Sequence, residues 1–196
     1  LCYRIPKFIE VVQDKERIML LIKRQVAIIK KHKLDVIIMP SDEHKAATYR
    51  YILEDIKDVK VKMAFHPVYL YNQKEAEITA YRLLRDYIGL FIVDDCDKLG
   101  VSKLIGTGDA IELKDLFKKF IAKDYEGFIV LDTNLIKKKK KAQSYNWFDK
   151  TFSKHKKNEL KVLEEYLALN KDTSNFQIIK AQLLVLYLVF LNKKTL

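Results

Sequence analysis

The stretch IGLFIVDDCDKLGVSKLIGTGDAIELKDLFKKFIAKDYEGFIVLDTN, residues 88–134, contains the pattern that decides the fold. It begins with the apolar run Gly89–Val93 and continues into an amphipathic segment, in which large apolar residues recur at helical spacing from Leu113 to Ile121. It ends with a second apolar run, Phe128–Leu131. Short continuous apolar runs are typical of strands buried on both faces, as in parallel sheets. The stretch therefore predicts a strand, a helix and a second strand parallel to the first.

The same alternation extends toward the N-terminus. Helical spacing of apolar residues predicts helices over 15–31, 49–56 and 76–87, and each is followed by a strand, over 36–39, within 59–69 and over 89–93. Four such units in series imply right-handed crossovers and a parallel sheet. The sheet is either half of an eight-stranded barrel or a small open doubly wound sheet. No glycine-rich phosphate turn of the Rossmann type accompanies an early strand.

Composition restricts the class of protein. Of 196 residues, 49% are hydrophobic and 32% charged, with only 5 Gly and 3 Pro, which indicates a globular chain rather than a disordered or collagen-like one. Cys2 and Cys96 form no CxxC pair and no signal peptide is apparent, so we expect free thiols and a cytoplasmic location. The longest apolar run, Leu183–Leu191, is shorter than the ~20 residues of a membrane span, so no membrane partner is expected.

The net charge of +11 is concentrated in one region. Ten lysines lie between Lys137 and Lys161 against two acidic residues, a local balance of 10 − 2 = +8. We therefore expect a barrel portion, residues 1–136, followed by a lysine-rich connector and C-terminal helices, residues 137–196, that pack on the barrel or on a partner. The lysine run with Trp147 and Phe148 has the composition of a nucleic-acid site, but an exposed connector is the simpler interpretation.

The last segment, Phe176–Leu191, predicts a helix that is apolar on nearly all sides. Such a helix has to be buried against another surface. We expect it to pack across the barrel or at a contact between two copies of the chain.

The ends of the strands carry a resemblance to a known family. An acidic cluster after one strand, the G-x-G-D loop Gly106–Asp109, the sequence Asp124–Phe128 and an acid after the last strand look like the final third of the xylose isomerase-like barrels. This superfamily includes sugar phosphate isomerases and epimerases and endonuclease IV type AP endonucleases. The segment Ala64–Asn72 is similar to the end of the family's sixth strand. The resemblance implies a (β/α)8 TIM barrel, or its C-terminal half, with a C-terminal helical extension.

The resemblance also implies a divalent metal, Mn²⁺, Mg²⁺ or Zn²⁺, held at the carboxyl ends of the strands by two glutamates, an aspartate and a histidine. The fifth-strand glutamate falls on Met39 or Pro40, and the seventh-strand histidine falls on Phe91 or Ile92, so two ligands are missing. The remaining candidates for metal ligands are His66, Asp95 and Asp132, with Asp94 as an alternative to Asp95. Each of them also has a purely structural interpretation, as a solvated loop acid or a histidine beside Pro67.

Three residues are candidates for substrate binding. Tyr69 occupies a position where the family commonly has a histidine, and Gly106 and Gly108 lie in the loop before a predicted helix. The two glycines either form a tight turn or present amides to a phosphate group. No catalytic residue can be assigned from the sequence.

These observations favour a protein similar to sugar phosphate isomerases and epimerases, of degenerate or altered activity, with a sugar or sugar phosphate as its partner. The first alternative is a non-catalytic barrel that serves as a binding or scaffold protein. The second is an AP endonuclease-like protein, which needs a histidine-rich zinc cluster that the four histidines of this chain cannot supply. Because half a barrel leaves two open sheet edges, we also expect either a missing N-terminal half or a second copy of the chain.

Overall fold

The computed structural model describes residues 1–5, 12–41, 44–132 and 175–191. Its contacts divide the chain into two compact units. The first unit contains Leu1–Ile92 and Glu126–Val130, and the second contains Val93–Tyr125 and Leu131–Leu196.

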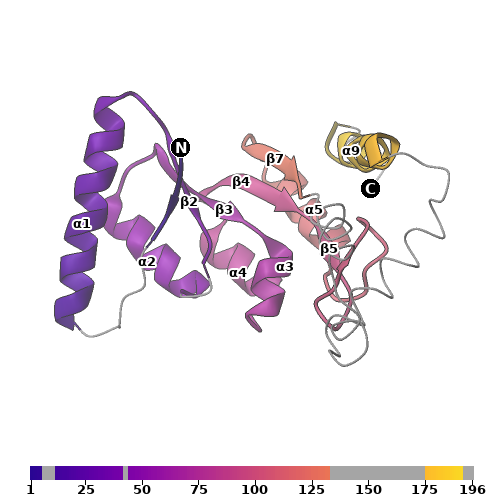
Figure 1. Cartoon of the computed structure of the whole chain (residues 1–196), viewed down its shortest axis with the longest axis horizontal. Coiled ribbons are helices and arrows are strands. Elements are labelled where there is room, and N and C mark those ends of the chain that lie inside the picture. The colour runs from indigo at the N-terminus through magenta and orange to yellow at the C-terminus, as the bar shows by residue number, and fades with distance from the viewer. Residues whose placement is uncertain (6–11, 42–43, 133–174, 192–196) are drawn as a thin grey trace, which may run out of the picture. The chain divides into compact units, whose positions relative to one another are not determined.

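The described residues alternate between strands and helices (Figure 1). In chain order the elements are β1 (Cys2–Arg4), α1 (Val12–Lys31), β2 (Val36–Met39), α2 (Ala46–Ile56), β3 (Val61–Phe65), α3 (Pro67–Asn72), α4 (Glu77–Leu84), β4 (Ile88–Val93), β5 (Asp95–Cys96), β6 (Ser102–Lys103), α5 (Leu113–Ala122), β7 (Phe128–Leu131) and α9 (Asn175–Leu191).

The order of the strands distinguishes the two sheet types that the sequence left open. The main sheet has the order β1-β2-β3-β4-β7, in which every strand lies beside its predecessor in the chain, apart from the short β5–β6 pair. The pairs β1–β2, β2–β3 and β3–β4 are all parallel. A doubly wound sheet reverses its strand order at a switch point, whereas a (β/α) barrel does not. The predicted fold class, parallel strands alternating with helices as in a barrel or its C-terminal half, with a C-terminal helix, is confirmed.

Helices cover one face of the sheet in the first unit. Val36 and Ile38 of β2 are fully buried, whereas the alternate residues Ile37 and Met39 are only half-buried. Phe65 of β3 packs edge-on against Tyr81 of α4, with ring centroids 6.0 Å apart. Figure 1 shows α2 and α4 on the same side of β2 and β3. Burial on one face and partial exposure on the other is the pattern of a barrel wall, whose helices lie outside.

A bulge at Gly89 changes the alternation along β4. Met63 pairs with Ile88 but Ala64 pairs with Leu90, so Gly89 is an extra residue. A Cβ atom on Gly89 would lie 2.6 Å from Cβ of Lys62, which no other side chain can accommodate without a shift. After the bulge, each side chain of β4 lies on the opposite face of the sheet from the one it would occupy without the extra residue. Phe91 consequently packs beside Phe65, with ring centroids 6.0 Å apart.

The second unit contains α5 and the C-terminal helix α9. The amphipathic helix α5 buries Leu113, Leu116, Phe117 and Phe120. Phe117 packs edge-on against Phe190 of α9 with ring centroids 5.3 Å apart, and the backbone N–H of Ile105 donates to Oε1 of Gln182 at 2.7 Å. The predicted apolar helix is thus present and packs on α5 through one side, while much of its opposite side, including Leu184 and Tyr187, is exposed.

Several predicted features lie outside the described residues. The expected domain boundary at 136/137, the lysine run, Trp147 and Phe148 all fall within residues 133–174. Within the described ranges, no helix combines the length and apolar character that crossing a membrane requires. Four short elements, β1, α3, β5 and β6, are additions to the predicted pattern.

Candidate functional site

Polar residues follow the strands at their carboxyl ends. Ser41 comes after β2 and Pro40, His66 directly follows β3, Asp94 directly follows β4 and Asp132 directly follows β7. In (β/α) barrels the carboxyl ends of the strands and the loops after them form the active site. These four positions are therefore where functional side chains are expected.

Asp94 and Asp132 lie together in the second unit. Each offers a carboxylate oxygen within 4.8 Å of the other. Asp94 is only 5% exposed and Asp132 is half-buried. The backbone N–H of Asp132 donates to the carbonyl of Val93 at 2.9 Å, which fixes the end of β7 beside the end of β4. Carboxylate oxygens this close can serve together as ligands of a divalent cation.

Asp95 is buried and its carboxylate contacts the backbone of its own loop. It is 1% exposed. Oδ1 accepts a hydrogen bond from the N–H of Cys96, and Oδ2 accepts from Gly106 and Gly108, all at 2.9 Å. Burial raises the pKa of Asp95, and these three hydrogen bonds offset part of that rise. The geometry gives Asp95 a structural task as the anchor of the loop, and its predicted role as a metal ligand stays a prediction.

Glycine is required at position 108 of this loop. A Cβ atom there would lie 2.1 Å from Oδ1 of Asp95 and 2.3 Å from the carbonyl oxygen of Cys96. Gly106 has a different constraint, since its φ of +83° lies in the left-handed region and nothing stands within 4 Å of its Cβ position. The amides of both glycines point at Asp95. Both amides are thus bonded within the loop, and substrate binding by these glycines stays a prediction.

His66 and Tyr69 lie together in the first unit. His66 precedes the first turn of α3, and its ring stacks on that of Tyr69 with centroids 6.0 Å apart and planes at 27°. The hydroxyl of Tyr69 accepts a hydrogen bond from Nε2 of Gln73 at 3.0 Å, and the same Nε2 donates to the carbonyl of Ser41 at 3.1 Å. The stacking and this bonded chain restrict the orientation of the His66 ring.

Residues beyond the predicted set extend this polar group. The backbone N–H of Ser41 donates to the Tyr49 hydroxyl at 2.8 Å, and the buried His44 ring packs edge-on against Tyr49. Ser41 was detectable from the sequence as the polar residue that follows Pro40 at the end of a predicted strand. Gln73 carries no such signal, because it reaches the strand end only through the turn of α3.

The positions where the resemblance lacks ligands are apolar in space as well. Phe91 is fully buried and Ile92 is 9% exposed, and neither offers a donor atom to a metal. β2 ends at Met39 and is followed by Pro40. The thioether of Met39 binds hard cations poorly, and the ring of Pro40 offers them no ligand atom. Within the second unit, the carboxylates of Asp94 and Asp132 are therefore the oxygen ligands that the strand ends offer to a hard divalent cation.

Known structures share this fold. A xylose isomerase domain protein from Planctomyces limnophilus is 15% identical, with a TM-score of 0.55 over 89% of this chain and 59% of its own. An L-ribulose 3-epimerase is 14% identical, with a TM-score of 0.53 over 84% and 56%. The probable 3-DHS dehydratase AsbF of Bacillus anthracis, which is involved in petrobactin synthesis, is 11% identical, with a TM-score of 0.53 over 79% and 58%. No protein-family model matches the sequence, and no curated protein matches it either.

Identities this low establish the fold alone, and the reactions named for these structures differ. The chain spans less than three fifths of the length of each of the three. Their shared architecture agrees with the sequential, parallel strand order and with helices on one face of the sheet. The chain therefore has the α/β fold of part of a TIM barrel, which it shares with these three structures.

Proposed function

We propose that the chain is the C-terminal part of a sugar isomerase- or epimerase-like barrel, with an altered ligand set and an altered activity on a sugar or sugar phosphate. The observation that carries the proposal is the Asp94–Asp132 pair, whose carboxylate oxygens lie within 4.8 Å at the carboxyl ends of β4 and β7. Solved structures with this fold include an L-ribulose 3-epimerase, which supports a sugar as the class of ligand.

We further propose that His66 joins the two aspartates as the third ligand of a divalent cation. Support comes from the sheet register. Ala64 pairs with Leu90, so Leu90, Ile92 and Asp94 alternate onto one face of β4, the face that Ala64 and His66 share on β3. Two carboxylates and one imidazole suit Mn²⁺, Mg²⁺ or Zn²⁺. Asp94 replaces Asp95 in this set, because the carboxylate of Asp95 accepts three hydrogen bonds from backbone amides of its own loop.

A divalent cation bound there would supply Lewis-acid polarisation of a sugar carbonyl. The residues of this chain would hold the cation through Asp94 and Asp132 and orient the imidazole of His66 through its stacking on Tyr69. The glutamate that the resemblance assigns to proton transfer has no counterpart at Met39 or Pro40. That substitution is the reason for proposing an altered rather than an ordinary isomerase activity.

The test is titration of the purified full chain with Mn²⁺ and Zn²⁺ by calorimetry. We expect one site, and we expect Asp132→Asn, Asp94→Asn and His66→Gln each to weaken binding by at least about tenfold. The matched control is Asp115→Asn, which removes an exposed carboxylate from α5 in the same unit and should leave affinity unchanged. Binding that survives all three substitutions would contradict the proposed ligand set.

The alternative proposal is a non-catalytic barrel that binds a ligand or serves as a scaffold. The apolar residues Phe91 and Ile92, at a position where the resemblance expects a ligand, favour it. Absence of any metal binding in the titration would select this alternative. In either case we propose that β1, which among the described residues lies at one edge of the sheet beside β2, receives a further strand from an N-terminal half or from a second copy. A cytoplasmic location stays a prediction.

A further inference from the structure

The C-terminal helix α9 contains far less charge than a helix at the surface of a protein usually does. Lys180 is its only charged residue among 17, whereas α1 has eight charged residues among 20. A helix that is apolar on all sides requires burial on more than one side. In the second unit, α9 is buried on one side, where Ile178 and Leu186 are each 6% exposed and Phe190 contacts Phe117 of α5.

The opposite side of α9 exposes a group of large apolar side chains. Leu184, Tyr187 and Leu188 are 55%, 60% and 48% exposed, and Leu183 beside them is 48% exposed. Residues three and four positions apart lie on the same face of a helix, so these side chains form one continuous surface. We call these four residues the α9 face. A continuous exposed apolar surface is typical of a site of protein association.

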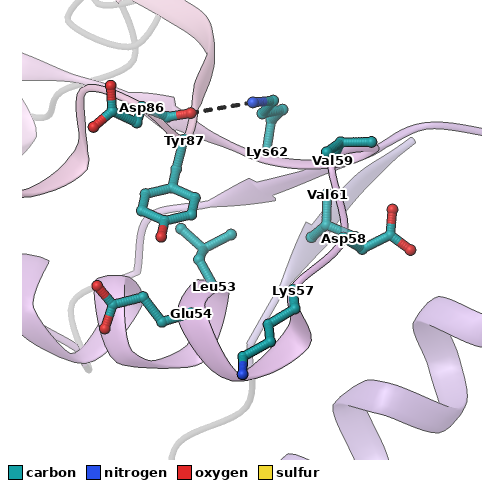
Figure 2. A pocket seen from close by; sticks show the side chains of 9 residues that line it. All are labelled: Leu53, Glu54, Lys57, Asp58, Val59, Val61, Lys62, Asp86 and Tyr87. Carbon is teal, nitrogen blue, oxygen red and sulfur yellow. Dashed lines mark hydrogen bonds between the residues drawn. The ribbon is translucent and has the colours of Figure 1, made fainter.

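Apolar surface in the first unit has a different character, because charges interrupt it. On α1, the exposed Leu20 lies between Arg17 and Arg24 on the same side of the helix. Figure 2 shows a cavity of about 410 Å³ in the same unit, and five of the nine residues that line it are charged. Both of these surfaces offer charged groups to water or to a polar partner. The α9 face has only Lys180 on its own helix to offer.

The distribution of charge indicates what covers the α9 face. The chain has a net charge of +11, so two copies that met through a lysine-rich surface would repel each other. At the α9 face this repulsion is limited to one lysine from each copy. An apolar face offers no charge to complement a charged partner, but it is complementary to itself. A twofold axis brings the same face of two copies together.

We propose that two copies of the chain associate through the α9 face, as a pair of antiparallel α9 helices with Leu184 at the twofold axis. A parallel pair would place the two Lys180 ammonium groups side by side. In the antiparallel pair, Lys180 of each copy lies opposite Leu188 of the other, and the two Lys180 positions are about 12 Å apart along the helices. That separation exceeds the screening length of about 8 Å at physiological salt.

The size of the α9 face determines how strong the association is. Mutual covering of the four side chains of each copy removes roughly 1,000 Å² from water, which is near the lower limit for a specific interface. We therefore expect a dissociation constant on the order of micromolar. The proposal does not depend on the proposed metal site or on sugar chemistry.

The experiment is analytical ultracentrifugation of the full chain at concentrations up to about 200 µM. We expect the mass to rise from 23.1 kDa to twice that value and no further, because a twofold contact is closed. A chain that stays monomeric throughout would overturn the proposal, since another part of the chain or another protein would then cover the α9 face. A mass that continues to rise beyond the dimer would also overturn it.

Variants locate the contact. Leu184→Glu places a carboxylate from each copy at the axis, and we expect it to raise the dissociation constant at least about 100-fold. The matched control is Leu20→Glu, the same substitution at a leucine of α1 that is 51% exposed, and it should leave the constant within about twofold. Should Leu184→Glu fail to fold, Leu188→Gln takes its place, with an expected weakening of about tenfold. A dimer that survives these α9 variants would overturn the proposal, because the contact would then lie elsewhere, for example at the edge of the sheet.

Disulfide cross-linking tests the orientation of the two helices. In a Cys2→Ser background, which removes the exposed native thiol, Leu184→Cys should form a disulfide between copies under oxidising conditions. Lys180→Cys should not, because its two positions lie farther apart than the roughly 7 Å between Cα atoms that a disulfide can span. Equally efficient cross-linking at both positions would overturn the antiparallel arrangement.

Discussion

The loop Asp95–Asp109 and the connection Ile56–Lys62 each contain an aspartate that organises backbone, and the two aspartates do so in opposite ways. Asp95 is buried, and its carboxylate accepts three hydrogen bonds from amides of its own loop. Asp58 binds the Lys30 ammonium and accepts from the backbone N–H of Lys60 at 3.0 Å, at the surface. Burial raises the pKa of Asp95, whereas the bond to Lys30 lowers the pKa of Asp58. The fully buried Asp95 holds its own loop together, whereas the half-buried Asp58 links α1 to the connection before β3.

The largest effect expected from this difference is that of Asp95→Ala. The substitution leaves the amides of Cys96, Gly106 and Gly108 without their acceptor, and a buried donor without a partner costs about 1–3 kcal/mol. Because water can reach part of the loop, we expect a total loss of about 3 kcal/mol in the free energy of unfolding. Urea denaturation of the full chain measures it.

The matched control is Asp109→Ala, which removes an exposed acceptor of the Lys98 amide from the same loop. We expect this variant to lose less than about 1 kcal/mol. Equal losses for the two variants would show that burial of Asp95 does not set the stability of the loop.

The second effect concerns the two glycines. Gly108→Ala places a methyl group on Oδ1 of Asp95 and on the Cys96 carbonyl, and we expect a loss of about 2–3 kcal/mol from overpacking. The added methyl group of Gly106→Ala meets no atom within 4 Å, so we expect this variant to lose only the cost of its positive φ, about 1 kcal/mol in the free energy of unfolding. The two midpoints in urea, measured side by side, separate steric from conformational cost. A larger loss at Gly106 would contradict the geometry of the loop.

Much of the main sheet could be predicted from the sequence. The strands 36–39, 89–93 and 128–131 agree closely with β2, β4 and β7, because a run of apolar residues between amphipathic helices has few other interpretations. The three-residue strand β1 and the six-residue helix α3 were missed because elements this short contain less than two periods of their pattern. The choice between a barrel and a doubly wound sheet needed the strand order, which depends on contacts between segments far apart in the chain.

The choice between Asp94 and Asp95 could not be made from the sequence. A strand that is apolar on both faces shows no alternation from which a face can be assigned, and the bulge at Gly89 adds a further change of face. The sequence offered two interpretations of the G-T-G-D loop, a tight turn or a set of amides that bind a phosphate group, and substrate binding there stays a prediction. In the structure the amides of Gly106 and Gly108 donate to the carboxylate of Asp95, 11 and 13 residues earlier in the chain. The same geometry serves a ligand phosphate or an internal aspartate, so composition alone cannot distinguish them.

The smallest effect is a pH dependence of stability that comes from the half-buried Asp58. The folded pKa of Asp58 lies below its ordinary value of 3.8, chiefly because the carboxylate accepts a hydrogen bond from Lys30 and then one from the N–H of Lys60. A lowered folded pKa stabilises the chain above pH 3.8, and this contribution disappears as the pH falls through the folded pKa. The gain is less than about 1 kcal/mol because the pair is near the surface and screened by salt.

Asp58→Asn should therefore lower the free energy of unfolding at pH 7 and have a smaller effect as the pH falls below 3.8. Urea denaturation of wild type and variant at pH 7 and at pH 3 measures the difference. Lys30→Gln tests the cause, since it should reproduce most of the loss at pH 7. A difference between wild type and Asp58→Asn that grows toward low pH would reverse the assigned sign and remove the electrostatic contrast between Asp58 and Asp95.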